Sequence, residues 1–205
     1  ADRYWDTTHW KNLTNPEAGG YPSKKDDIAM IFMYGTKSLF LNQDITIGQI
    51  WIGGEGGNFY FRGQQGGEGA KTVTFERSDK EMPLFRISGL EQTDGVVLPW
   101  ALPHFYIQPS LKTPLIFDCS NDLLFDAGCP FDPSSRDDVA GKSLQRVTLE
   151  TGFILNIPKG ARVVFDGTNA GNRDGDTQRG NVTFRFYSNA FVGEGTVDYN
   201  GPSSV

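Results

Sequence analysis

The sequence predicts an all-β protein, and three observations support this fold class. Residues 45–76 form short runs in which apolar residues alternate with small or polar ones, the period of a half-buried strand. Glycines separate these runs, and glycine readily adopts the positive φ angles that sharp turns need. Elsewhere no segment keeps a 3.6-residue period, and glycine or proline interrupts every candidate helix.

The same alternation predicts strands along most of the chain. Several of them end in Asp-Gly or Asn-Gly, as in VVFDG at Val163–Gly167 and VDYNG at Val197–Gly201, which is typical of turns. The predicted strands are Ile28–Met33, Ser38–Leu41, Ile45–Ile52, Asn58–Phe61, Thr72–Phe75, Leu84–Ile87, His104–Ile107, Leu115–Phe117, Leu123–Phe125, Arg146–Leu149, Phe153–Ile157, Ala161–Phe165, Val182–Tyr187 and Thr196–Tyr199.

Two all-β architectures fit these strands. A right-handed parallel β-solenoid is favoured, because its strands are short, its corners are tight and its strands recur about every 20–30 residues. The alternative is an antiparallel β-sandwich of the jelly-roll type, whose strands run to about five to eight residues at even spacing. The dense rhythm of the first half of the chain favours the solenoid.

The length of 205 residues predicts a single domain that covers residues 1–205. Within it, residues 1–97 are expected to form an N-terminal cap and glycine-cornered rungs, and residues 144–205 to form further strands. Residues 98–143 contain both cysteines and a high density of proline, which cannot donate to a β-ladder. We therefore expect an irregular inserted lobe over residues 98–143.

The charge of the chain restricts its partners. The formal net charge is −6, the pI is about 4.9, and no cluster of Lys and Arg occurs, which argues against binding to nucleic acid or to an anionic membrane surface. No apolar stretch of about 18 residues is present, so we expect no membrane span. The chain opens at Ala1, as a mature secreted protein does after removal of a signal peptide.

Cys119 and Cys129 are the only cysteines. Two strand-sized arms folded back on each other would bring them within disulfide range, and closing such a loop stabilises by about 2–3 kcal/mol. Two free thiols are the alternative, and a metal site would need further Cys or His nearby. A Cys119–Cys129 disulfide would indicate an oxidising compartment, so the expected location is secreted or at the cell surface.

The N-terminal residues carry a resemblance to a known class of proteins. Residues Trp5–Phe32 read WDTTHWKNLTNPEAGGYPSKKDDIAMIF, with two tryptophans around a Thr-rich turn and then the strand DDIAMIF. This segment resembles the opening of autotransporter-type passenger repeats and related bacterial surface β-helix proteins, and the resemblance covers about the first 75 residues. The matching positions are Trp5, Trp10, Pro22, Asp27, Ala29 and Phe32.

The two tryptophans have three interpretations. The first rung of a solenoid exposes an open hydrophobic end, which large flat side chains such as Trp5 and Trp10 can cover. They are equally compatible with ordinary core positions. A third interpretation is that an exposed pair stacks on sugar rings.

No set of residues indicates catalysis. The two histidines, His9 and His104, are isolated, and His104 lies among aromatic residues, as a structural histidine does. No serine has the strand–turn–helix context of a nucleophile elbow. Catalytic and cofactor-binding residues are therefore expected to be none.

One acidic segment is a candidate calcium site. Residues 166–181 bring carboxylate and amide oxygens close together in sequence, and Ca²⁺ prefers such ligands. The spacing and terminal Glu of an EF-hand are missing, so a solvated loop that turns on Asp-Gly pairs is the alternative. The candidate ligands are Asp166, Asn169, Asn172, Asp174 and Asp176.

These observations predict a non-catalytic secreted or cell-surface structural protein. Its partner would be a second copy of itself, bound head to tail through exposed β-edges to build a filament, sheath or adhesive layer. The alternative is a polysaccharide-binding or polysaccharide-degrading β-helix protein, which would use clustered carboxylates with a basic residue on one face of the solenoid.

Overall fold

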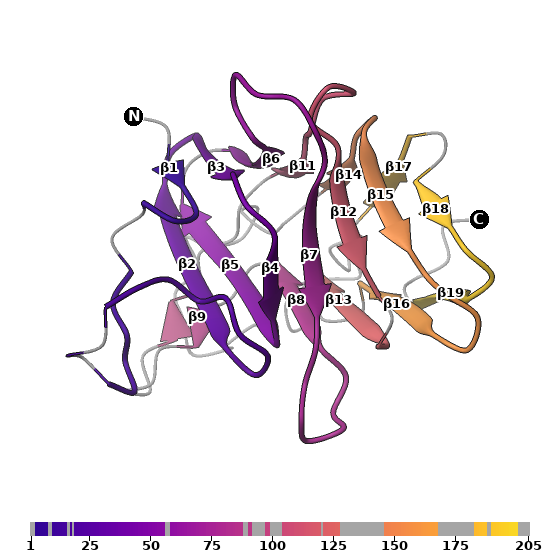
Figure 1. The fold of residues 1–205 in the computed structure, drawn as a ribbon, viewed down its shortest axis with the longest axis horizontal. Helices are drawn as coiled ribbons and strands as arrows, with labels where there is room; N and C mark the ends of the chain where they lie inside the picture. The colour runs from indigo at the N-terminus through magenta and orange to yellow at the C-terminus, as the bar shows by residue number, and fades with distance from the viewer. Residues whose placement is uncertain are drawn as a thin grey trace, which may run out of the picture.

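The computed structural model describes residues 3–7, 10–15, 17, 19–55, 58–87, 90–91, 97–98, 104–119, 121–127, 146–167, 183–187 and 190–200. In these residues the chain forms three sheets of parallel strands that lie side by side along the long axis of the molecule (Figure 1). The all-β prediction is confirmed.

Each strand is assigned to a sheet by its neighbours. Sheet A consists of β1 (Arg3–Tyr4), β3 (Lys37–Leu41), β6 (Asn58–Gly63), β11 (His104–Ile107), β14 (Arg146–Leu149) and β17 (Thr183–Phe186). Sheet B consists of β2 (Ile28–Tyr34), β5 (Gln49–Glu55), β8 (Leu84–Ile87), β13 (Leu123–Ala127), β16 (Arg162–Asp166) and β19 (Thr196–Asn200). Sheet C consists of β4 (Ile45–Ile47), β7 (Lys71–Phe75), β12 (Leu115–Asp118), β15 (Phe153–Asn156) and β18 (Phe191–Val192).

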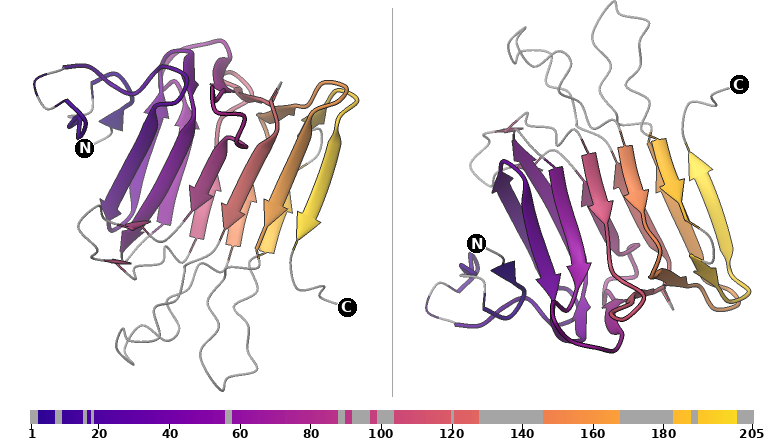
Figure 2. Two further views of the ribbon diagram at one scale, coloured as in Figure 1. Left: turned by 90° about the horizontal axis from the view of Figure 1, so that it is seen from below. Right: turned by 90° about the horizontal axis from the view of Figure 1, so that it is seen from above.

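The chain visits the sheets in the repeating order A, C, B. Each strand therefore pairs with the corresponding strand of the next coil. The complete coils are β3–β4–β5 (coil 1), β6–β7–β8 (coil 2), β11–β12–β13 (coil 3), β14–β15–β16 (coil 4) and β17–β18–β19 (coil 5). Strands β1 and β2 precede coil 1 at one end of the stack, and coil 5 lies at the other (Figure 2).

This arrangement is a parallel β-solenoid, as the strand rhythm predicts. The antiparallel sandwich is wrong, because every strand pair within sheets A, B and C is parallel. Among the described strands, the antiparallel pair is β9 (Leu90–Glu91) with β10 (Val97–Leu98), which follows β8 and precedes β11 in the sequence.

The core is built from inward-facing residues that repeat from coil to coil. In sheet B, the row Ile50–Phe85–Phe125–Phe165 is in register and fully or almost fully buried. Phe125 stacks on Phe165 with ring centres 4.7 Å apart. Because alternate residues of a strand point to opposite faces, the inward rows of the three sheets meet in one core, which mixes aromatic and aliphatic side chains.

The predicted strand Ile45–Ile52 is divided into β4 and β5 at Gly48. A Cβ at this position would lie 2.9 Å from the Cα of Asp26, so only glycine fits the corner without a shift of the backbone. The two-residue strands β1, β9, β10 and β18 were not predicted, because two residues show no period.

The inserted lobe predicted over residues 98–143 needs correction. Within that range His104–Ala127 form coil 3, with the same sheet order and in-register pairing as the other coils. Pro109 and Pro114 lie in the connection between β11 and β12, where a missing N–H costs no ladder bond. The prolines therefore indicate the corner between sheets A and C and not an irregular lobe. Residues 128–145 lie outside the described residues.

Coils 1 to 4 each pass from sheet B to the next strand of sheet A at the same corner of the solenoid. The connection between β5 and β6 spans only residues 56–57, whereas the later connections span residues 88–103, 128–145 and 167–182. Within coils 1 to 5, the longest connections therefore all lie at this one corner.

Candidate functional site

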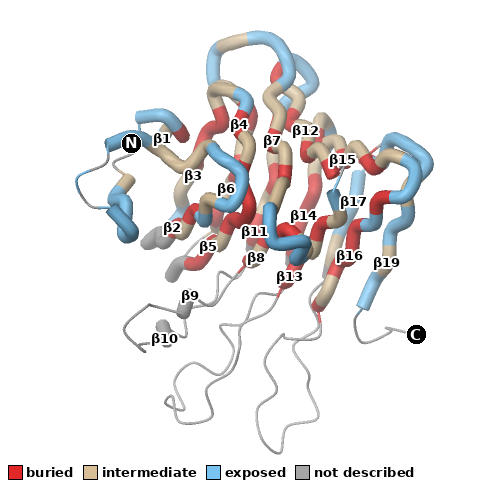
Figure 3. Tube along the Cα trace, turned by 60° about the horizontal axis from the view of Figure 1, so that its bottom comes forward, coloured by how far each residue is buried: buried red, intermediate tan, exposed pale blue. Residues whose placement is uncertain are grey.

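The C-terminal end of the solenoid carries most of the large exposed apolar side chains of the described chain. Strands β17, β18 and β19 are the last strands of sheets A, C and B, and among the described residues no strand pairs with their outer edges. Figure 3 shows this end as largely exposed. The exposed apolar residues of coil 5 are Phe186, Tyr187, Phe191, Val192, Val197 and Tyr199, with 36–52% of each accessible.

Several of these side chains extend rows that are buried in the earlier coils. Tyr199 is in register with Phe165, and Val197 with Val163, yet both are about half exposed where their predecessors are buried. Phe191 continues the buried row of sheet C beside Leu155. Within the described residues, the end of coil 5 is thus a cross-section of the hydrophobic core that no further strand covers.

At the N-terminal end the aromatic core is covered, and the outer strands there are β1, β2 and β4. Trp5 has no exposed surface and packs on Phe61, with ring centres 6.2 Å apart. Its indole Nε1–H donates to the carbonyl oxygen of Pro22 at 2.9 Å, and the Nε1–H of Trp10 donates to the carbonyl oxygen of Trp5 at 2.7 Å. A sugar has no access to the buried Trp5 ring.

The outer face of sheet A carries a row of hydrogen-bonded planar side chains. Arg62 Nη2–H donates to Gln108 Oε1 at 2.6 Å, and Gln108 Nε2–H donates to Glu150 Oε2 at 3.0 Å. Next to this row, Tyr60 and Tyr106 stack with ring centres 4.9 Å apart and an interplanar angle of 15°. The Arg62 guanidinium lies 4.8 Å above the Tyr60 ring, so the two rows are joined by a cation–π contact.

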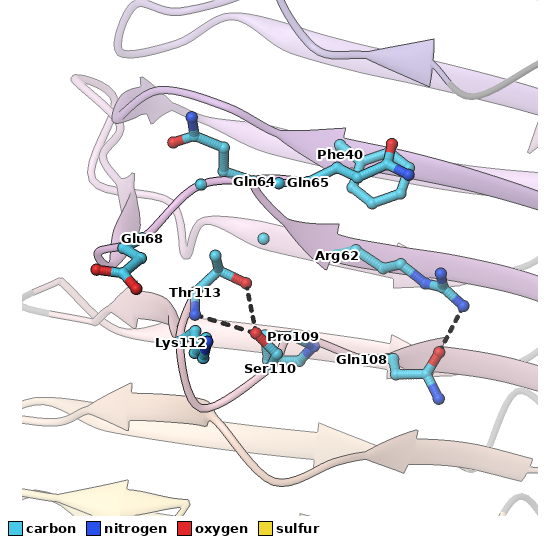
Figure 4. Close-up of a pocket in the computed structure, with 13 residues that line it drawn as sticks. Phe40, Arg62, Gln64, Gln65, Glu68, Gln108, Pro109, Ser110, Lys112 and Thr113 are labelled. Atoms are coloured by element: carbon cyan, nitrogen blue, oxygen red, sulfur yellow. Dashed lines mark hydrogen bonds between the residues drawn. The ribbon is translucent and has the colours of Figure 1, made fainter.

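A hollow of about 570 Å³ lies where this row meets the corner between sheets A and C (Figure 4). Its walls are two turns, one after β6 and one after β11, and the turn after β11 is held by hydrogen bonds between Ser110 and Thr113. Gly63 lets the two turns approach closely, since a Cβ there would collide with the carbonyl oxygen of Thr113. The other lining residues include Phe40, Arg62, Gln64, Gln65, Glu68, Gln108 and Lys112.

The outer face of sheet B carries a different row, with Trp51, Arg86, Asp126 and Asp166 on successive coils. Arg86 Nε–H donates to Asp126 Oδ2 at 2.8 Å, and the guanidinium lies 5.0 Å from the Trp51 ring. Asp126 is only 4% exposed, so this charge is shielded from solvent and paired with Arg86. The row links neighbouring coils by charge and stacking.

The structure contains no disulfide at Cys119. The predicted disulfide with Cys129 is therefore corrected as far as Cys119 is concerned, because Cys119 is a free, fully buried thiol. Its Sγ–H donates to the carbonyl oxygen of Phe117, with 3.7 Å between sulfur and oxygen. It continues the inward alternation of Leu115 and Phe117, so its side chain points into the core. Burial raises the pKa of this thiol far above its ordinary value. Cys129 lies outside the described residues.

Most of the predicted calcium ligands cannot be placed. Asp166 ends β16 and is half-buried, whereas Asn169, Asn172, Asp174 and Asp176 lie outside the described residues. Within the part of the chain that the structure describes, no three His, Cys, Asp or Glu side chains gather closely enough to hold a metal ion.

Little of the two histidines lies within the described part of the chain. His9 lies outside the described residues. The backbone of His104 begins β11, where it pairs with Asn58 on one side and Arg146 on the other.

Sequence reasoning missed the surface rows on sheets A and B. Arg62, Gln108 and Glu150 lie 42–46 residues apart from their neighbours in the row, and only the strand register aligns them. A signal was nonetheless present, because each residue follows an aromatic or apolar residue at the end of a predicted strand.

Comparison with protein-family models, with curated proteins and with solved structures gave no match to this chain. The described residues include no helix long and apolar enough to cross a bilayer.

Proposed function

We propose that the protein is a non-catalytic, extracellular structural β-solenoid that associates with a second copy through its open C-terminal end. The observation that carries the proposal is the contrast between the two ends of the stack: Trp5 is buried at one, whereas Phe191 and Val197 are exposed at the other.

Two physical costs favour a partner at this end. The outer edges of β17, β18 and β19 present backbone N–H and C=O groups that a further layer of strands would satisfy. The exposed aromatic side chains of coil 5 would leave water on association, which is favourable in proportion to the apolar area buried.

The covered core at the N-terminal end favours a symmetric contact between two C-terminal ends. Such a contact is isologous and closes as a dimer. The predicted head-to-tail filament would instead require coil 5 to pair with the N-terminal end, where Leu13 and Ile28 are the exposed apolar residues. The two arrangements use different surfaces, so they can be separated.

The extracellular setting rests on the resemblance to autotransporter-type passengers. The residues that carry this resemblance form one contact unit in the structure: Trp10 binds Trp5, Trp5 binds Pro22, and the Asp27 carboxylate accepts the N–H groups of Ser23 and Lys24. Because these contacts cover the first coil, this segment has a physical role as an end cap, the role that the resemblance implies for it. The free thiol of Cys119 gives no support to an oxidising compartment.

Sedimentation velocity over a range of concentrations tests the association. We expect the wild type to associate and Phe191→Lys and Val197→Lys to shift it toward monomer, because each places a charge in the apolar cross-section. The control is Leu111→Lys, a residue 76% exposed on a turn of coil 3, which should behave as the wild type does. Far-UV circular dichroism confirms that each variant is folded.

Leu13→Lys separates the two arrangements. Unchanged association of this variant supports contact between C-terminal ends, whereas loss of association supports a head-to-tail filament. A wild type that stays monomeric at high concentration would overturn the proposal.

A further inference from the structure

We propose that the outer face of sheet A is a binding site for a neutral, hydroxyl-rich glycan whose chain runs along the solenoid axis. This site is separate from the open C-terminal end and does not depend on self-association. It comprises the row Arg62–Gln108–Glu150, the stacked Tyr60 and Tyr106, and the adjoining hollow.

The row presents groups suited to sugar hydroxyls. A guanidinium, a primary amide and a carboxylate lie on three successive coils, and each has hydrogen-bonding capacity beyond the contact that holds it. Since each hydroxyl of a sugar can both donate and accept, a mixed row of donors and acceptors matches it better than a row of one kind.

One donor of this row has no partner. The Nε–H of Arg62 is shielded from solvent and finds no acceptor among the described residues. A buried donor without an acceptor is unfavourable, so Arg62 is held at an energetic cost. Arg62 also lines the hollow shown in Figure 4, where the other N–H groups of its guanidinium can donate to a ligand oxygen.

Aromatic rings flank the polar row. Tyr60 and Tyr106 lie side by side on neighbouring coils and are half-buried. Phe40 also lines the hollow, but it is only 4% exposed, and its ring centre lies 5.9 Å from the Arg62 guanidinium. Because the two tyrosine rings face each other in the stack, a sugar would pack its C–H groups against their edges while the neighbouring polar side chains bind its hydroxyls.

The geometry favours a chain over a single sugar. Strands of sheet A are about 4.8 Å apart, so the row from Arg62 to Glu150 extends about 10 Å along the solenoid axis. The hollow itself, at about 570 Å³, lies within the range of ordinary ligand pockets of about 300–1,000 Å³.

The charges favour a neutral ligand. Arg62 and Lys112 are balanced by Glu68 and Glu150, so a polyanion would meet as much repulsion as attraction. Nucleic acid is disfavoured further by the formal net charge of −6.

Isothermal titration calorimetry with three neutral glycans, cellohexaose, laminarihexaose and mannohexaose, tests the site. Oligogalacturonate serves as the acidic glycan for comparison. We expect the wild type to bind at least one neutral hexaose and Arg62→Gln to lose at least tenfold in affinity. The matched control is Arg162→Gln on β16 of sheet B, where Arg162 makes a comparable pair with Asp198 at 2.6 Å. This control should stay within twofold of the wild type.

A second pair of variants tests the stacked rings. Tyr106→Phe keeps the ring and should retain binding, whereas Tyr106→Ala removes it and should weaken binding at least tenfold. Ligand-induced protection from hydrogen exchange is expected in residues 58–69 and 104–113, which form the site.

The proposal is overturned if no neutral hexaose binds the wild type, if oligogalacturonate binds more tightly than all of them, or if Arg62→Gln and Arg162→Gln lose affinity equally. It is also overturned if protection appears only on sheet B or sheet C. None of these results bears on the sedimentation experiment, so the glycan site and the self-association can fail independently.

Discussion

Phe85 is the residue on which most of the aromatic core converges. It is fully buried on β8, and its ring centre lies 5.1–6.5 Å from those of several other rings. These rings come from all three sheets, so Phe85 connects the walls of the solenoid. Its ring partners are Phe61, Phe75, Phe105, Phe117 and Phe125.

Phe85→Ala should reduce the free energy of unfolding by about 3–5 kcal/mol, because it removes a large buried side chain and leaves a cavity among rings that cannot collapse freely. Urea denaturation followed by circular dichroism measures this change. Leu111→Ala, at a position 76% exposed, should change stability by no more than about 0.5 kcal/mol. Similar losses in both variants would contradict the packing described for the core.

Asp26 holds a corner through its side chain. Its backbone has φ of 70°, and its carboxylate accepts the backbone N–H of Ser78 at 2.7 Å, which lowers the pKa of the carboxyl below its ordinary value. A folded-state pKa below the unfolded one stabilises the protein above about pH 4. This contribution is lost as the pH falls through the folded pKa.

Asp26→Asn should therefore weaken the dependence of the melting temperature on pH between about pH 5 and pH 2. Asparagine also tolerates a positive φ, so the backbone of the corner is preserved. Parallel slopes for the wild type and the variant across this range would show that Asp26 makes no pH-linked contribution.

The thiol of Cys119 should be unreactive in the folded protein, because it is fully buried and its pKa is raised by that burial. In a Cys129→Ser variant, iodoacetamide should leave Cys119 unmodified in buffer and alkylate it in concentrated urea, as measured by intact mass. Rapid modification without denaturant would contradict its placement in the core.

At the level of the strands, much of the fold could be predicted from the sequence. Alternation located the strands of the complete coils except β18, because one face of each strand is buried. The division at Gly48 could not be predicted, since it depends on the backbone of Asp26, which approaches from elsewhere in the chain.

The register of the strands also could not be predicted from local sequence patterns. The surface rows depend on this register. Tyr60 stacks on Tyr106 and Arg62 binds Gln108 only because β6 and β11 pair in one alignment. The irregular lobe was predicted because a high density of proline indicates a break in the strand pattern. Pro109 and Pro114 instead lie in the connection between β11 and β12, and the strands on either side are regular.

Gly63→Ala tests the close approach of the turns after β6 and β11. The new methyl group would collide with the backbone carbonyl of Thr113, so we expect a loss of about 1–3 kcal/mol in unfolding free energy, measured by urea denaturation. Gly19→Ala is the matched control, because nothing lies within 4 Å of its Cβ position. Equal stability of the two variants would show that the turns can separate freely.

Over the whole molecule, each coil contacts chiefly the coil before and the coil after it, so stability should vary along the stack. Coil 3 has neighbours on both sides, whereas coil 5 has one among the described residues. Native-state hydrogen exchange should therefore be slowest in β11–β13 and fastest in β17–β19. A single exchange free energy for all the coils would indicate that the solenoid opens only as a unit.

At the corner between sheets B and A, the connection can vary in length while the strands of neighbouring coils keep their register. Coils 1 and 2 are joined there by residues 56–57 and coils 3 and 4 by residues 128–145, yet the strands of both pairs of coils stay in register. A foreign peptide grafted at this corner would thus add sequence without altering the stack. The scaffold is suited to displaying variable segments from one side, since natural length variation is already tolerated there.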